Sequence, residues 1–190
     1  MKTAEKLKLA AHQIISKEGV DALSMRKLAE AIGIKGPSIY KHFSSKDELL
    51  NSLKSEGLDR LYHLMSKAVK KTDPPIQNLI SLSMAYQEFA KKHPEEFKLI
   101  FLETTSLRGD LEEEFTGNNP YGLLLVEMKK YAEQNKLLQS STELEAATYG
   151  YWSLTHGMVC LKQTHLKDFK ADFMLADQLA LNAYLQGVVK

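Results

Sequence analysis

Apolar residues recur at helical spacing along most of the chain, and this periodicity constrains the fold more than any other feature. In residues 3–18 the apolar side chains fall three and four positions apart, which places them on one face of an α-helix. Later segments repeat the pattern, and none shows the alternation of a β-strand. Because only 10 glycines and 5 prolines interrupt the 190 residues, few helix breakers are present. The sequence therefore predicts an all-α fold of about nine helices.

Capping and breaking residues divide this pattern into separate helices. Gly33 ends the second helix, and Pro37 suits the first turn of a third helix that has Gly36 as its N-cap. Ser45 and Glu48 have the spacing of a capping box, which opens a long fourth helix. A loop or frayed turn is expected at residues 104–119. We expect helices at about residues 3–18, 25–32, 37–43, 46–70, 76–91, 95–103, 120–136, 143–165 and 172–188.

The net charge of +1 is distributed unevenly along the chain. Residues 1–43 contain eight Lys and Arg but only four Asp and Glu, a net charge of +4. The remaining residues, 44–190, have a net charge of −3. A near-neutral total thus conceals a basic N-terminal segment joined to an acidic body, and a basic segment is typical of a nucleic-acid partner.

The second and third predicted helices, joined by a tight turn at Gly33, form a helix-turn-helix, which presents its second helix to base edges in the major groove. Ile39 and Phe43 would anchor that helix, so its other side chains face outward. Basic residues in the first turn of the second helix oppose the helix dipole, which a bound anion would offset. We predict a DNA interface made of Arg26, Lys27, Lys35, Gly36, Pro37, Ser38, Tyr40, Lys41, His42 and Lys46. The alternatives are solvated surface lysines and, for Tyr40, a partly packed core tyrosine.

The stretch SMRKLAEAIGIKGPSIYKHFSSKDELL, residues 24–50, resembles the N-terminal DNA-binding domain of the tetracycline-repressor (TetR) family. Lys35 departs from the pattern, in which a small hydroxyl residue often caps the third helix. The resemblance implies a homodimer that binds a near-palindromic DNA operator. The matching points are Leu28-Ala29, Gly33-Ile34, Tyr40-x-x-Phe43 and Ser45-Lys46-x-x-Leu49.

The resemblance also implies two domains. Residues 1–46 would form the DNA-binding domain, and residues 47–190 a domain that binds a ligand and dimerises. The helix at about 46–70 would link them.

Residues 149–158, YGYWSLTHGM, are the most unusual stretch of the C-terminal body. Trp152, His156 and Gly157 form a W-x-x-x-H-G pattern that resembles a TetR subgroup named for these residues. Tyr149, Trp152 and His156 share one helix face, and an apolar pocket with a few polar groups is the usual small-molecule site. The alternative is an ordinary core. Candidate lining residues are Met84, Phe89, Phe101, Tyr121, Leu125, Met128, Tyr149, Trp152 and His156.

Small residues on the last two predicted helices indicate a helix–helix interface. Gly150 and Gly157 lie one heptad apart, and glycine inside a helix costs about 1 kcal/mol relative to alanine, so a close backbone approach is expected. Two such helices per chain could build a four-helix dimer interface. The alternative is packing within one chain. The candidates are Gly150, Leu154, Gly157, Leu161, Ala176, Leu179, Ala180, Ala183 and Gly187.

Motifs of metal, cofactor and enzyme chemistry are not found in the sequence. Cys160 is the single cysteine, and His156 and His165 lie nine residues apart on opposite helix faces. HExxH, Gly-rich phosphate loops and GxSxG do not occur. We therefore expect no catalytic residue, no metal and no cofactor. The charged N-terminal segment and the short apolar run at 123–126 predict neither a signal peptide nor a membrane span, and we expect a cytoplasmic protein.

These observations together predict a ligand-responsive transcriptional regulator and not an enzyme. We expect a repressor that binds a palindromic operator as a homodimer and is released by a small apolar or amphipathic ligand. One alternative is a small-molecule-binding protein or enzyme on the same fold that has lost DNA binding. Another is a regulator controlled by a protein partner. The sequence leaves the ligand, the operator and the choice between repressor and activator open.

Overall fold

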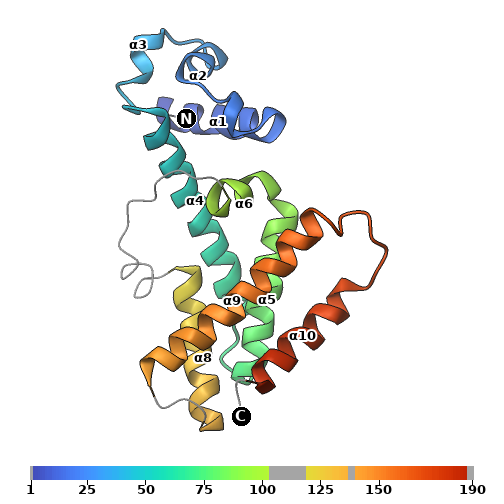
Figure 1. Cartoon of the computed structure of the whole chain (residues 1–190). Coiled ribbons are helices and arrows are strands. Elements are labelled where there is room, and N and C mark those ends of the chain that lie inside the picture. The colour runs from blue at the N-terminus through green and yellow to red at the C-terminus, as the bar shows by residue number, and fades with distance from the viewer. Residues whose placement is uncertain (1, 103–118, 137–139, 188–190) are drawn as a thin grey trace. The chain divides into compact units, whose positions relative to one another are not determined.

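The computed structural model of the chain describes residues 2–102, 119–136 and 140–187 (Figure 1). These residues contain nine α-helices, one short 3-10 helix and no strand, which confirms the predicted all-α class. The described residues divide into two compact units, one made of residues 2–59 with 93–102, the other of residues 60–92 with 119–136 and 140–187. None of the described helices is long and apolar enough to cross a membrane.

The first unit folds around one apolar core. Gly19, with a φ of 84°, ends the first helix, and Ser24 caps the second by accepting a hydrogen bond from the Lys27 N–H at 3.2 Å. The unit contains α1 (Thr3–Glu18), η1 (Val20–Ala22), α2 (Met25–Ala31), α3 (Gly36–Ile39), the first part of α4 (Lys46–Ala68) and α6 (Pro94–Phe101). Its fully buried residues include Leu7, Ala11, Leu28, Ile39, Leu49, Leu53 and Leu99.

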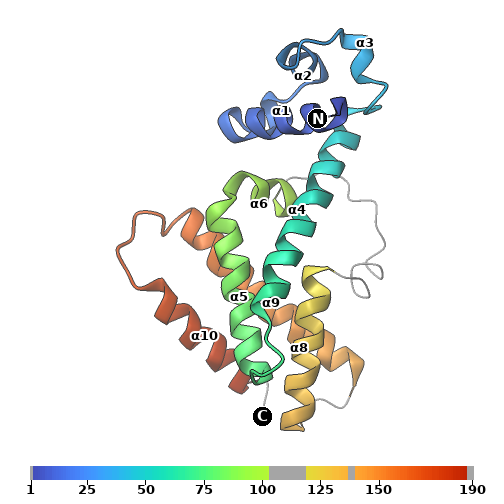
Figure 2. The same cartoon turned by 180° about the vertical axis from the view of Figure 1, so that it is seen from behind.

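The second unit consists of the remainder of α4 with α5 (Pro75–Lys92), α8 (Pro120–Asn135), α9 (Ser141–Gln163) and α10 (Phe173–Gly187). Within this unit α5 lies between α8 and α10, and α9 packs across all three (Figure 2). Buried polar groups pair inside it: the Ser83 and Thr155 hydroxyls lie 2.7 Å apart, and Asn78 donates to Glu127 at 3.1 Å. Fully buried apolar residues include Leu79, Leu82, Met128, Tyr151, Leu181 and Leu185.

The predicted helix ends agree with the structure to within two residues, except for the third helix. That helix spans only Gly36–Ile39, not 37–43, because the following amides bond in tight turns, with the His42 N–H donating to the Ile39 carbonyl at 2.9 Å. Its N-cap is Lys35, in an extended conformation, so the prediction that Gly36 is the N-cap is wrong. The expected loop at 104–119 lies outside the described residues apart from Asn119.

The predicted capping box of α4 forms only in part. The Ser45 hydroxyl accepts a hydrogen bond from the Glu48 N–H at 3.0 Å, as expected. The Glu48 carboxylate, however, accepts from the N–H and the hydroxyl of Ser44, each at 2.6 Å, and not from Ser45. The hydroxyl of Ser44 competes successfully because it adds a second hydrogen bond to the same carboxylate oxygen.

Candidate functional site

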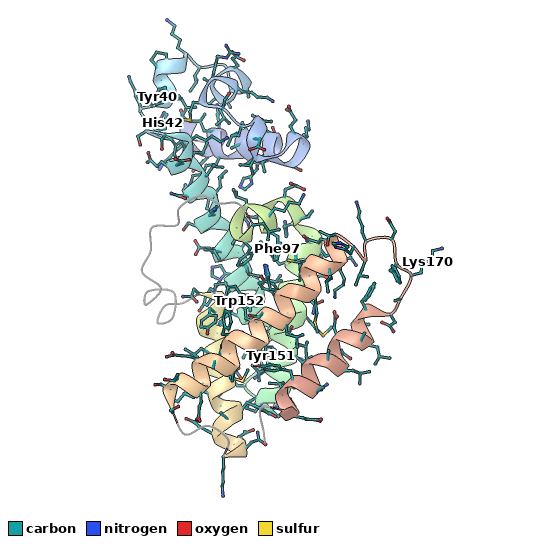
Figure 3. The ribbon with its side chains drawn as sticks, viewed as in Figure 1. Tyr40, His42, Phe97, Tyr151, Trp152 and Lys170 are labelled. Carbon is teal, nitrogen blue, oxygen red and sulfur yellow. The ribbon has the colours of Figure 1, made fainter. Side chains whose placement is uncertain are left out.

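The surface around α3 is built on buried anchors. Ile39 is fully buried and Phe43 is 6% exposed, as their i, i+4 spacing predicts. Tyr40 is 57% exposed, which excludes the alternative of a packed core tyrosine. Tyr40 and His42 lie together on the segment that follows α3 (Figure 3). Of the ten predicted contact residues, the exposed ones are Arg26, Lys35, Gly36, Pro37, Tyr40, Lys41 and His42, and the half-buried ones are Lys27, Ser38 and Lys46.

Acidic neighbours hold two of the predicted basic side chains. The Lys27 ammonium donates to the Glu18 carboxylate at 2.6 Å, and Arg26 lies 3.6 Å from Glu30. These two ion pairs offset the unfavourable interaction of Arg26 and Lys27 with the α2 dipole. A bound anion is therefore not needed to explain why basic residues lie in the first turn of this helix.

Three further lysines differ in what they contact. The Lys46 ammonium donates to the Val20 carbonyl at 3.1 Å and so ties α4 to η1. Lys35 and Lys41 are exposed and form no ion pair with any described residue. Among the predicted contact residues, Lys35 and Lys41 are therefore the exposed cations without an acidic partner in the described part of the chain.

Glu48 places a negative charge at this surface. The sequence pattern assigns this residue only a part in the α4 capping box. Its carboxylate sits in the first turn of α4, and the free N–H groups of a helix N-terminus favour a bound anion such as a phosphate. The two hydrogen bonds from Ser44 lower the pKa of Glu48, so the group is ionised at neutral pH. A phosphate at this helix end would meet a fixed negative charge, which makes the α3 segment the better phosphate-binding surface.

Aromatic side chains from three helices meet in the second unit. The Tyr86 hydroxyl lies 2.8 Å from Nδ1 of His156. The Trp152 ring packs edge-on against two other rings, with 5.7 Å between its centroid and that of Tyr121 and 6.3 Å between its centroid and that of His156. Burial raises the pKa of Tyr86 and lowers that of His156, so both side chains are neutral at pH 7. We call Tyr86, Tyr121, Trp152 and His156 the aromatic cluster.

Tyr86 was not among the predicted ligand-binding residues, although its position in the sequence indicates a buried helix face. Leu79, Leu82, Tyr86 and Phe89 follow the i, i+3, i+7, i+10 spacing of one helix face, and all four are buried. A tyrosine on such a face needs a hydrogen-bond partner for its hydroxyl. That requirement points to a polar residue such as His156 on a neighbouring helix.

The other predicted pocket residues differ in how deeply they are buried. Phe89 and Met128 are fully buried core residues, and Leu125 is half-buried. Tyr149 is 63% exposed, whereas Tyr151 on the same helix is fully buried, with 6.0 Å between the centroids of its ring and that of Tyr184 of α10. Phe101 belongs to the other unit and contacts Phe97, with 4.9 Å between ring centroids.

A cavity of about 460 Å³ lies elsewhere in the second unit, among α5, α9, α10 and the α9–α10 connection. Of the predicted pocket residues only Met84 lines it. No group of metal-ligating side chains occurs in the described part of the chain.

The predicted interface residues on α9 and α10 fall into two groups. A methyl group at Gly150 would collide with the Tyr184 hydroxyl, so the close approach at this glycine is to α10 of the same chain. Around Gly157, by contrast, the space is open. Leu154 and Ala180 are half-buried, and the exposed residues are Leu161, Ala176, Leu179, Ala183 and Gly187.

Two family matches cover most of the chain. Residues 9–53 match the family described as bacterial regulatory proteins, tetR family, and residues 79–181 match the tetracyclin repressor-like C-terminal domain. The HTH-type transcriptional regulator YobS of Bacillus subtilis (strain 168) is 24% identical over 182 residues, which are 95% of this chain and 89% of YobS.

Solved structures share the whole fold. A protein from Rhodococcus sp. RHA1 superposes with a TM-score of 0.83 at 21% identity, over 100% of this chain and 97% of that one. A TetR variant from Acinetobacter baumannii AYE, in complex with minocycline, superposes with a TM-score of 0.65 at 17% identity, over 98% of this chain and 96% of that one.

The C-terminal match alone covers more than half of the chain, and the N-terminal match runs from within α1, through α2 and α3, into the first part of α4. The family is one of transcriptional regulators, so the enzyme alternative is set aside. The chain belongs to the TetR family of DNA-binding, helix-turn-helix transcriptional regulators.

Proposed function

We propose that the protein is a ligand-responsive repressor that binds a palindromic operator as a homodimer in the cytoplasm and is released by a small apolar or amphipathic ligand. The observation that carries the DNA-binding part is the exposed segment 35–42, whose cations have no acidic partner among the described residues while Ile39 and Phe43 anchor it in the core. The name of the matched C-terminal domain, tetracyclin repressor-like, supports repression.

The side chains of this segment are suited to different parts of the operator. Lys35 and Lys41 can donate to phosphate or to guanine, and Ser38, at the start of α3, to a base edge or phosphate. Tyr40 and His42 are exposed donors for phosphate oxygens. Ser38 is therefore the residue proposed to influence sequence preference, and the lysines the residues proposed to supply affinity.

The proposed ligand site is the aromatic cluster, which combines apolar rings with a neutral His156 and the Tyr86 hydroxyl. The minocycline complex of the Acinetobacter relative supports a small-molecule effector for this fold. We also propose that Trp152, His156 and Gly157 place the chain in the subgroup named for these residues.

Release is proposed to occur through a population shift. A homodimer can place two copies of α3 in successive major grooves, about 34 Å apart. A ligand that binds more tightly to a conformation with another spacing shifts the population away from the DNA-bound state, by no more than its differential affinity. Helix α4 is the proposed lever, because it is one continuous helix that contributes residues to both units.

The first prediction tests the DNA surface. Replacing Lys35 and Lys41 by Ala is expected to weaken operator binding at least tenfold, and to reduce its dependence on salt by about two counterions per protomer. Fluorescence anisotropy with a labelled operator at several salt concentrations measures both. The matched control replaces the exposed Lys67 and Lys71 of the second unit. Equal affinity of the two double variants would refute the assignment of the DNA surface.

A further inference from the structure

The cavity among α5, α9 and α10 has an apolar interior. Ala90, Val159 and Leu181 are almost fully buried and line it. Further apolar lining comes from Met84, Leu166, Phe169, Phe173 and Met174. Its volume, about 460 Å³, falls within the range of small-molecule sites, and mobile methionines together with aromatic rings allow the walls to adapt to an apolar ligand.

One wall of the cavity carries a neutralised polar group. The Lys162 ammonium donates to the carboxylate of Asp177 and, at 2.5 Å, to the side-chain carbonyl of Gln87. It also lies 6.0 Å from the centroid of the Phe173 ring. Because Lys162 and Asp177 form an ion pair, their opposite charges cancel and the interior presents no net charge to a ligand.

The mouth of the cavity, in contrast, is positive. Lys91 and Lys167 line the cavity and are exposed. The exposed carboxylate among the lining residues, Glu88, is paired with Lys92 at 2.8 Å, and this contact lowers the pKa of Glu88. Because Lys92 pairs with Glu88, the ammonium groups of Lys91 and Lys167 are the exposed charges of the lining that form no ion pair with a described residue.

We propose that this cavity is a ligand-binding site, separate from the aromatic cluster, for an amphipathic anion: a molecule whose apolar body fills the interior and whose single carboxylate lies at the mouth between Lys91 and Lys167. None of the residues of the aromatic cluster lines the cavity. The ammonium groups of Lys91 and Lys167 would repel a cationic amphiphile, and a neutral amphiphile would form no ion pair with them. The inference does not depend on the proposed effector site, because direct binding tests it without DNA.

The experiment is isothermal titration of the full-length protein with decanoate, kept below its micelle concentration, and with decanol and decyltrimethylammonium for comparison. We expect one decanoate per chain, bound at least tenfold more tightly than the cation. Replacing Lys91 and Lys167 by Ala is expected to weaken decanoate binding about tenfold, since two exposed ion pairs are lost, and to leave decanol binding unchanged. Met84→Trp, which fills the cavity at its edge, is expected to weaken both ligands.

The matched control removes the same charge outside the cavity, by replacing Lys71 and Lys170, the latter on the α9–α10 connection (Figure 3). Equal loss of decanoate binding in the control would overturn the proposal, as would the absence of binding or equal affinity for the cation. Trp152→Phe is expected to leave decanoate binding unchanged. Loss of binding in that variant would assign the ligand to the aromatic cluster and refute a separate site.

Discussion

At the scale of single residues, Gly33 and Gly36 show how two glycines of one turn serve different purposes. Gly33 has a φ of 71°, in the left-handed region that side chains with a Cβ rarely adopt, and it reverses the chain between α2 and α3. Gly36 has an ordinary helical backbone, and a Cβ there would meet nothing within 4 Å. Only the first position requires glycine for conformational reasons.

Gly33→Ala is accordingly expected to lower the free energy of unfolding by about 1 kcal/mol, because the left-handed backbone is strained with a Cβ. Gly36→Ala is the matched control: a Cβ has open space at both positions, and only φ differs. Here alanine is expected to be neutral or stabilising, since it reduces the entropy of the unfolded chain. Chemical denaturation measures both, and equal destabilisation would contradict the conformational argument.

At the scale of elements, α6 packs against α4 within the first unit through a position without a side chain. A Cβ at Gly57 would lie 2.7 Å from the Ile100 methyl and 2.9 Å from the Glu96 carboxylate. The described residues 93–102 are therefore part of the same compact unit as α1 to α3, although about 35 residues separate Gly57 from them in the sequence.

Gly57→Leu is expected to destabilise the protein by about 2 kcal/mol, because an enlarged side chain overpacks a tight helix contact. Gly57→Ala is expected to be milder, since the atoms it meets are the ends of flexible side chains and alanine favours the helix by about 1 kcal/mol. Urea denaturation tests this order. In the Gly57→Leu background, Ile100→Ala is expected to restore part of the loss, and a simple sum of the two losses would contradict direct packing.

At the scale of the whole molecule, large apolar side chains that do not line the cavity remain exposed on the last two helices. Leu161, Leu175 and Leu179 are 49%, 54% and 61% exposed. Exposed apolar side chains gathered in this way are typical of an interaction surface. They support the proposed homodimer, for which two helices per chain would form a four-helix interface.

Leu179→Glu is expected to convert the proposed dimer to a monomer, because a charge would be buried at the interface, and to weaken operator binding as a consequence. Sedimentation velocity measures the first effect and anisotropy the second. Leu9→Glu on α1 is the control, since Leu9 is also exposed, at 49%, but lies in the other unit. A monomeric wild type, or a dimeric Leu179→Glu variant, would refute this interface.

The amino-acid sequence by itself determined the helices apart from the extent of the third, the buried anchors Ile39 and Phe43 and the family, because capping, periodicity and motif spacing are local. Only the tertiary structure decided which exposed cations remain without a partner. Lys27 meets Glu18 and Lys46 meets the Val20 carbonyl across sequence gaps that no periodicity describes. It also decided that Tyr86 joins His156, and that the cavity lies beside Lys162 and not beside Trp152, since cavities arise where helices distant in sequence pack.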